Sequence, residues 1–340
     1  MFWRISGSLL AALLLLGTAG LAAYGPKPSV SAWRDKYLPP EAVPYPDDNP
    51  YSKAKDDLGH MLFFDPLLSG AQSRSCSTCH NPGLSWGDGL PRAVGEGQAS
   101  MRLRSPTLID IAWVPVLGWD GKFPDLESVA FVPITGTANM NLPEAALMSR
   151  LSAIPGYVQA FDRAFGNGEI TRRKVELALA TYQRSIVSPE APFDRWLKGD
   201  DLAINVSAKR GFALFNTKGR CAECHDGWAF TDGSFHDIGT AEGDDIGRGR
   251  LFPTSKKLRY AFKTPTLRDV VRRAPYMHDG SVPTLGAVVD LYDRGGIARP
   301  SRSEKIRPLG LTAQEKQDLV TFLDTLTTPP HPVPVPVLPR

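Results

Sequence analysis

The four cysteines of the chain form two copies of one short pattern, Cys-x-x-Cys-His. The copies are Cys76-Ser-Thr-Cys79-His80 and Cys221-Ala-Glu-Cys224-His225. This pattern is the attachment site of c-type haem, in which both thiols bond covalently to the porphyrin and the histidine becomes an axial ligand of the iron. The sequence therefore predicts two covalently bound haem c groups, and it leaves no cysteine for a disulfide.

Two other kinds of site use paired cysteines. A redox dithiol does not need a histidine in the fifth position of both copies. A four-cysteine zinc ribbon spaces its pairs by about 15–20 residues, whereas these pairs begin at positions 76 and 221. Both alternatives fit the pattern less well than haem attachment.

A haem iron has two axial positions, and the occupant of the second decides between electron transfer and catalysis. The chain has six histidines, and none lies between His80 and His225. In the first half only His60 could supply a second imidazole, and we favour its interpretation as an ordinary helix residue. Methionine ligands stay open for this half: Met101, Met140 and Met148. We expect the first iron to keep an open face.

An internal duplication links the two halves. Residues 105–111 (SPTLIDI) match residues 264–270 (TPTLRDV), and Asp-Gly follows in the same register at 120–121 and 279–280. Such a shared spacing predicts two related domains. In this register Tyr292 corresponds to Pro133, so the second half has a candidate iron ligand where the first has none. A buried helix tyrosine is the alternative role for Tyr292. His236, Met277 and His278 are further candidates.

The elements that must position these residues are helices and loops. Thr312 to Glu315 forms a capping box, apolar residues recur at helical spacing behind it, and 31 Gly with 30 Pro indicate many turns. We predict a mainly α fold with two cytochrome c-like haem domains in tandem and extended loops. The expected domains are 30–190 and 200–327.

Both ends differ in composition from the rest. Residues 1–23 resemble a secretory signal peptide, with Arg4 before an apolar stretch, and an uncleaved N-terminal anchor is the alternative. Residues 328–340 are Pro-rich, which predicts a disordered, extended tail. A net charge of +3 does not favour a nucleic-acid partner. Both alternatives for the N-terminus place the domains outside the cytoplasm, and we expect them in the periplasm.

Taken together, these motifs resemble the bacterial dihaem cytochrome c peroxidase superfamily over about residues 45 to 327. The most diagnostic segment is KTPTLRDVVRRAPYMHDGSVPTLGAVVDLYDRGG. The resemblance implies a peroxidatic N-terminal haem, an electron-transfer C-terminal haem, and Glu127 as the distal general acid/base. A helix-start glutamate, stabilised by the helix dipole, is the alternative role for Glu127.

The chain departs from the classical members in three ways, and the last two of these place it nearer the MauG-type branch. Leu117 stands where classical members often have a glutamine, and no histidine is present to block the first haem. Tyr292 stands where they place a methionine ligand. Because tyrosinate is a hard anionic ligand, it should lower the potential of the second haem. The resemblance also suggests Ca²⁺ near the carbonyls of Arg273 and Pro275, and a homodimer.

Three functions follow from this resemblance. The first is a periplasmic peroxidase that reduces hydrogen peroxide to water with electrons from a small cytochrome c or cupredoxin. The second is a MauG-like, peroxide-dependent oxidation of a partner protein. The third is an electron-transfer cytochrome without catalysis. Trp86, Trp113 and Trp119 are candidate relays between the haems.

Overall fold

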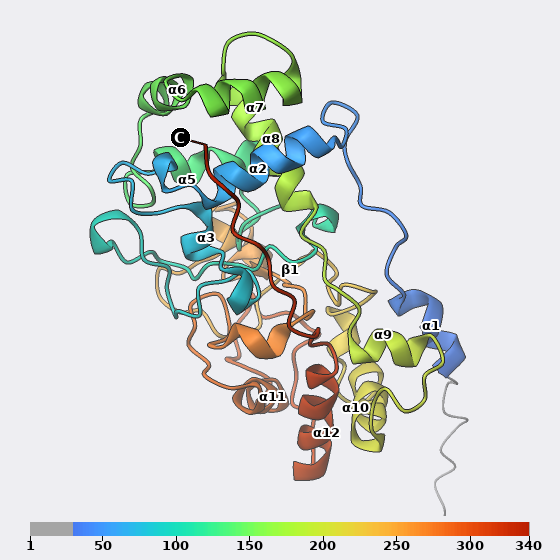
Figure 1. Cartoon of the computed structure of the whole chain (residues 1–340). Coiled ribbons are helices and arrows are strands. Elements are labelled where there is room, and N and C mark those ends of the chain that lie inside the picture. Colours follow the sequence, from blue (N-terminus) through green and yellow to red (C-terminus); the bar gives the residue numbers. More distant parts are fainter. Residues whose placement is uncertain (1–29, 340) are drawn as a thin grey trace, which may run out of the picture.

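The computed structural model describes residues 30–339, with helices joined by long loops (Figure 1). The predicted leader, residues 1–23, lies outside the described residues. Strand structure in the described part is limited to β1 (Phe235–His236) and β2 (Phe262–Lys263), which pair antiparallel. The predicted mainly α fold is confirmed. The assignment of the two halves as cytochrome c-like domains stays a prediction.

Twelve α-helices follow one another along the described chain. They are α1 (Val30–Tyr37), α2 (Lys53–Phe64), α3 (Cys76–Cys79), α4 (Leu126–Ala130), α5 (Val132–Thr135), α6 (Glu144–Ser152), α7 (Pro155–Phe165), α8 (Arg172–Arg184), α9 (Pro192–Leu197), α10 (Val206–Asn216), α11 (Leu285–Arg294) and α12 (Ala313–Asp324). Short 3₁₀ turns lie between them: η1 (Pro66–Leu68), η2 (Pro82–Leu84), η3 (Glu96–Gln98), η4 (Ile111–Trp113), η5 (Cys221–Glu223), η6 (Arg248–Arg250), η7 (Lys256–Leu258) and η8 (Val270–Arg273).

Two separate hydrophobic cores hold the halves. The first is formed mainly by α2, α6, α7 and α8, and the second by α9, α10, α11 and α12. The expected capping box is present at the start of α12, where Thr312 accepts from the backbone of Glu315. Helix α1 contributes Tyr37 to the second core. The expected first domain, 30–190, therefore includes a helix that packs with the other half.

Each core contains one close helix crossing that depends on a glycine. Gly59 of α2 lies against the backbone of Ala178 in α8, and Gly211 of α10 lies against the backbone of Asp318 in α12. A Cβ at either glycine would overlap a backbone carbonyl. Gly59 and Gly211 each lie in the helix before a haem motif, so each half has a close helix crossing ahead of its motif.

The duplication found in the sequence is visible in matching hydrogen bonds and backbone bridges of the two halves. Thr107 donates its hydroxyl to the carbonyl of Ser85 at 2.7 Å, and Thr266 donates to Ala229 at the same distance. Leu117 and Phe123 form an antiparallel bridge, as Tyr276 and Val282 do in the second half. The two halves therefore build the loop after each haem motif in the same way.

The C-terminal segment is extended and runs from the end of α12 along the molecule towards α6 (Figure 1). Its first residues are held by Thr328, which donates to Asp269. Val333 packs against the first core, and Pro339 lies beside Gly156 at the start of α7. The extended conformation matches the Pro-rich composition, while the expected disorder of this tail stays a prediction.

Substitution of either crossing glycine by alanine should destabilise the fold. Overpacking of this kind costs about 1–3 kcal/mol, because here the neighbour is backbone that cannot rotate away. Thermal unfolding of Gly59→Ala and Gly211→Ala should show a lower Tm. The control is Gly286→Ala in α11, where only Thr284 Oγ1 lies near the new Cβ. That change should leave Tm equal or higher, since alanine favours helix. A wild-type Tm in both crossing variants would contradict the packing argument.

Candidate functional site

The first haem motif forms the short helix α3 and the turn after it. Ser75 caps α3 through a reciprocal pair of hydrogen bonds with Thr78. His80 follows directly, and its Nδ1 lies 3.1 Å from the carbonyl oxygen of Trp86. Because a carbonyl can only accept, Nδ1 carries the proton and Nε2 keeps its lone pair. This is the tautomer that an iron ligand needs.

The second motif reproduces the same arrangement on η5. Nδ1 of His225 lies 2.9 Å from the carbonyl oxygen of Phe230. Burial lowers the pKa of His225 and of His80, so both imidazoles are favoured in the neutral form. Trp86 and Phe230 both have positive φ, and this bend turns each carbonyl back towards its histidine.

The cysteines of both motifs lie at the edge of apolar surroundings. Burial raises the pKa of the Cys76 and Cys221 thiols to about 12, and it also raises the pKa of Cys79. These groups stay protonated at neutral pH. Cys76 packs at the margin of the first core and Cys221 at the margin of the second, which is where the edge of a porphyrin would have to lie.

A deep cavity lies beside the second motif, and its lining fits a haem. Cys221, Cys224, His225 and Tyr292 all contribute to it. Most of the remaining wall is aliphatic or aromatic, as expected for a macrocycle: Leu267, Val270, Leu285, Val288, Val289, Leu309, Leu319 and Leu323. Two thiols, one correctly oriented imidazole and one phenol in a single apolar cavity are a suitable donor set for haem c.

Tyr292 reaches this cavity because α11 is continuous. The helix begins at Leu285 behind the N-cap Thr284 and runs to Arg294. In the first half the matching stretch is divided into α4 and α5, with Pro133 in the second piece. Burial, and the neighbouring Cys224 and Cys221, raise the pKa of Tyr292 well above its usual range. A tyrosinate would therefore form here only beside a compensating cation such as ferric iron.

Two alternative ligands of the second half are engaged elsewhere. Nε2 of His278 lies 2.7 Å from Oδ2 of Asp245, and its ring stacks on Phe262 with centroids 3.7 Å apart. His236 bonds Asp232 through Nε2, also at 2.7 Å. Met277 lines the cavity and stays an open candidate.

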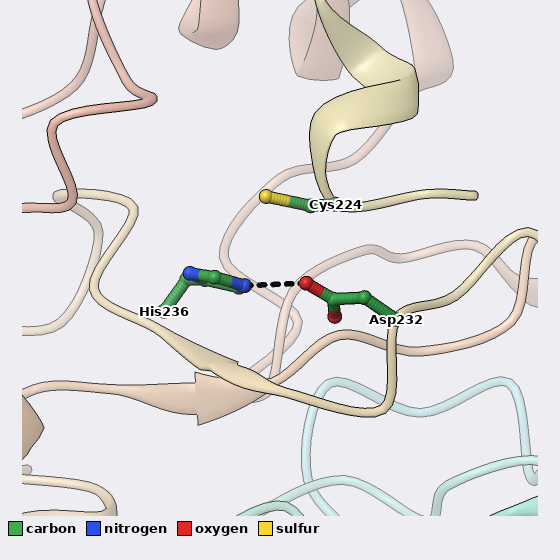
Figure 2. Close-up of side chains that lie close together, drawn as sticks. All are labelled: Cys224, Asp232 and His236. Atoms are coloured by element: carbon green, nitrogen blue, oxygen red, sulfur yellow. Dashed lines mark hydrogen bonds and ion pairs between the residues drawn. The ribbon is translucent and has the colours of Figure 1, made fainter.

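His236 also takes part in a small polar cluster with Asp232 and Cys224 (Figure 2). The carboxylate and the thiol raise the pKa of His236 to about 9, which favours an imidazolium. In Figure 2 Cys224 approaches from the haem motif and His236 from β1. A thioether at Cys224 would remove its thiolate, so this group is better interpreted as a charged wall of the haem cavity than as a separate metal site.

Glu127 lies in the first turn of α4 and is 5% exposed. Both carboxylate oxygens pair with Arg184, at 2.6 and 2.8 Å, and Nδ2 of Asn49 donates to Oε1 at 2.8 Å. Burial opposes ionisation, but the bonds from Arg184 and Asn49 outweigh it and hold the pKa below the usual value. Glu127 also fits its alternative role as a glutamate at the start of a helix, because Asp125 caps α4.

Arg184 and Asn49, the partners of Glu127, could not be identified from the sequence. Arg184 ends α8, and Asn49 lies in the segment before α2, so neither belongs to the distal motif. No motif marks them, since both meet Glu127 only through the crossing of α4 and α8.

Other predicted residues lie in separate places. Leu117 packs with Ile111 and Leu126 beside α4, and its side chain has no group that could form a hydrogen bond. His60 stacks on Tyr182 with centroids 4.8 Å apart, between α2 and α8. Met140 and Met148 pack in or against the first core.

The three candidate tryptophans lie in different surroundings. The side chain of Trp86 packs in the first core. Trp113 meets Trp228 edge to face, with centroids 4.9 Å apart. Trp119 lines the second haem cavity and donates Nε1 to the carbonyl of Arg104. Trp119 therefore joins the wall of the second cavity to the first half.

The expected Ca²⁺ position is not a simple oxygen site. The carbonyl of Arg273 accepts a hydrogen bond from the guanidinium of Arg104 at 2.8 Å. A calcium ion at this oxygen would lie beside the guanidinium groups of Arg104 and Arg273, which would oppose it electrostatically. The structure therefore offers no support for calcium at Arg273 and Pro275.

Comparison with known proteins decides the family. The chain is 47% identical to methylamine utilization protein MauG of Methylorubrum extorquens over 98% of this chain and 96% of that protein. The di-haem cytochrome c peroxidase family model matches residues 53–202. The chain belongs to the di-haem cytochrome c peroxidase family. It is thus a peroxidase-type oxidoreductase, and its family implies haem c cofactors.

Further relatives include both branches of the family. MauG of Methylophilus methylotrophus is 40% identical over the whole of both chains. Cytochrome c551 peroxidase of Pseudomonas aeruginosa is 31% identical over 96% of this chain and 95% of that protein. A solved structure of a MauG-like protein associated with microbial copper homeostasis superposes with a TM-score of 0.80, at 29% identity, and covers 86% of this chain and 94% of that one.

Replacement of Tyr292 by phenylalanine should alter the second haem while both haems stay attached. Phenylalanine keeps the apolar volume but removes the oxygen, so the absorption and EPR signals of one iron should change. Tyr276→Phe is the matched control, because Tyr276 also lines this cavity but donates its hydroxyl to Val271. Identical spectra for Tyr292→Phe and wild type would show that Tyr292 has only a packing role.

Proposed function

We propose that this protein carries two covalently bound haem c groups and uses hydrogen peroxide to oxidise residues of a partner protein, as a MauG-type enzyme. Cys76 and Cys79 would hold the first haem, with His80 as iron ligand. Cys221 and Cys224 would hold the second, with His225 and Tyr292 as iron ligands. The observation that carries the proposal is Tyr292 in the same cavity as His225.

The comparisons support this choice over a simple peroxide reductase. The two relatives named for methylamine utilisation match nearly the whole chain, at 47% and 40% identity. The cytochrome-c peroxidases that match are less similar, at 37% or below. We infer that the partner is a protein of methylamine metabolism and that both proteins meet in the periplasm. No helix among residues 30–339 is long and apolar enough to cross a membrane.

The residues of the chain divide the chemistry between them. Bound haem supplies the redox capacity for peroxide cleavage and for storing oxidising equivalents. The Trp86 carbonyl fixes the tautomer of His80, and the Phe230 carbonyl does the same for His225. An anionic phenolate from Tyr292 would stabilise the oxidised state of the second haem.

Glu127 is the proposed proton-transfer group at the first haem. Arg184 and Asn49 keep its carboxylate ionised, so it is ready to accept a proton from hydrogen peroxide. The same two partners restrict its position. Since Leu117 brings no hydrogen bond, the polar groups around Glu127 come from α8 and from the segment before α2.

A cytochrome c-type peroxidase is the second candidate. It is favoured by the matches to cytochrome-c peroxidases over more than four-fifths of the chain. In that case a small cytochrome c or cupredoxin would deliver electrons at the second haem, and hydrogen peroxide would be reduced to water. The expected homodimer belongs to this proposal as well.

One experiment separates the two functions. Purified holoprotein is mixed with hydrogen peroxide, and its absorption spectrum is followed with and without a reduced small cytochrome c. The MauG-type function predicts a spectral change that lasts for many seconds and cytochrome oxidation that is slow. Rapid, sustained cytochrome oxidation would overturn our proposal in favour of the peroxidase.

Glu127→Gln should slow the reaction with peroxide by about 10²–10⁴-fold, the usual contribution of a positioned acid/base. Because the change also leaves Arg184 unpaired, stability must be measured beside the rate; loss of one partner of a buried pair costs about 3–5 kcal/mol. Stopped-flow absorption gives the rate, and pyridine haemochrome gives the haem content.

The matched control is Glu176→Gln in α8. Glu176 is also buried and paired with an arginine, Arg172, at 2.7 Å. The Glu176→Gln variant should be less stable than wild type without a comparable loss in its rate of reaction with peroxide. Equal rates of reaction with peroxide for both variants and for wild type would show that Glu127 takes no part in the reaction.

A further inference from the structure

Three basic side chains that are buried or half-buried line the second haem cavity without a carboxylate partner. They are Arg104, Arg273 and Lys263. Among residues 30–339, none of the three lies within ion-pair distance of a carboxylate. By contrast, Arg268, a fully buried arginine of this half, bonds both oxygens of Asp194 at 2.7 and 2.8 Å.

The two arginines lie against each other. Arg104 is 7% exposed, and it donates to the backbone carbonyl of Arg273. Arg273 donates to the carbonyl of Thr266, while its buried Nε has no hydrogen-bond partner. Nearby acidic groups act at longer range: Asp88 on Arg104, and Asp269 and Asp110 on Arg273. Burial and the charge of Arg104 together lower the pKa of Arg273 to about 10.

Lys263 adds a third cation from β2. Its ammonium donates only to the carbonyl of Val116, at 2.9 Å, and burial lowers its pKa to about 8. Burying a charge without a counter-ion is costly, and two adjacent buried guanidinium groups increase that cost. Such a cluster is expected where an anion completes the site.

We propose that Arg104, Arg273 and Lys263 form the binding site for the propionate carboxylates of the second haem. A porphyrin in this cavity brings two carboxylates, which match the surplus positive charge of the lining. Guanidinium is suited to a carboxylate because it donates two parallel hydrogen bonds. This inference rests on the proposed placement of haem in the cavity.

The site also connects the two halves of the molecule. Arg104 comes from the first half, and its backbone N–H donates to the carbonyl of His278 at 3.0 Å. Its own carbonyl accepts from Trp119. Arg273 comes from the second half, in η8. A carboxylate bound between them would tie both halves together, so loading of the second haem would stabilise the contact between halves.

The test uses the full-length protein with both haems attached, and compares Arg273→Gln, Arg104→Gln and Lys263→Gln. Resonance Raman reports the propionate bending bands, and a redox titration reports the potential of the second haem. Each Gln variant should shift a propionate band and lower the potential, because removal of a positive charge favours ferric iron. Arg273→Lys should restore the potential in part.

Arg272→Gln is the matched control. Arg272 lies in the same 3₁₀ turn, but it donates to the carbonyl of Thr328 and does not line the cavity. It should leave both readouts unchanged. Unshifted bands in every Gln variant that carries two haems would overturn the proposal. A Gln variant that loses its second haem while Arg273→Lys keeps it would support the proposal.

Failure of the haem placement gives a different result. If Tyr292→Phe leaves the spectrum unchanged, or if wild type carries one haem, the proposed function fails before any propionate band is compared. If both haems are present and Tyr292 is a ligand, unshifted propionate bands would contradict only the proposed role of Arg104, Arg273 and Lys263.

Discussion

The hydrogen bond from a buried imidazole to a backbone carbonyl is the interaction on which both haem sites depend. His80 bonds Trp86, and His225 bonds Phe230. In each case the carbonyl fixes the tautomer, and burial keeps the ring neutral. Without this bond the ring could rotate, and Nε2 would not be held towards an iron. The positive φ of Trp86 and of Phe230 contributes to the same arrangement, because it turns each carbonyl towards its histidine.

Around this shared framework, the two halves differ in the side chain that we propose for the other side of each iron. A continuous α11 delivers Tyr292 to the second cavity, whereas Pro133 lies in the divided helix of the first half. The first half instead buries an ionised Glu127 between Arg184 and Asn49. In our proposal, one duplicated scaffold thus combines a proton-transfer site with a site suited to storing oxidising equivalents.

The two sites also differ in how their buried charges are balanced. The carboxylate of Glu127 has its own arginine, so its charge is balanced without a cofactor. Arg104, Arg273 and Lys263 have no such partner in the part of the chain that the structure describes, and all three line the second cavity. The second cavity is therefore incomplete as a protein structure alone. Haem carboxylates would complete it and link the halves at Arg104.

The sequence by itself determined the haem motifs, the duplication and the register that pairs Tyr292 with Pro133. These are local patterns, because a Cys-x-x-Cys-His motif and a shared spacing can be recognised without knowing the fold. It also indicated a helical protein, through capping and helical periodicity. The domain boundaries and the leader stay predictions from the sequence.

Only the tertiary structure decided which side chains meet across long distances in the chain. Arg184 and Asn49 reach Glu127 because α8 crosses α4 and the segment before α2. His278 and His236 were equal candidates in the sequence, yet Asp245 and Asp232 engage them. Arg104 and Arg273 are far apart in the chain but adjacent in the cavity wall. Ion pairs and burial depend on three-dimensional packing, and a single sequence does not reveal which charges packing leaves without a partner.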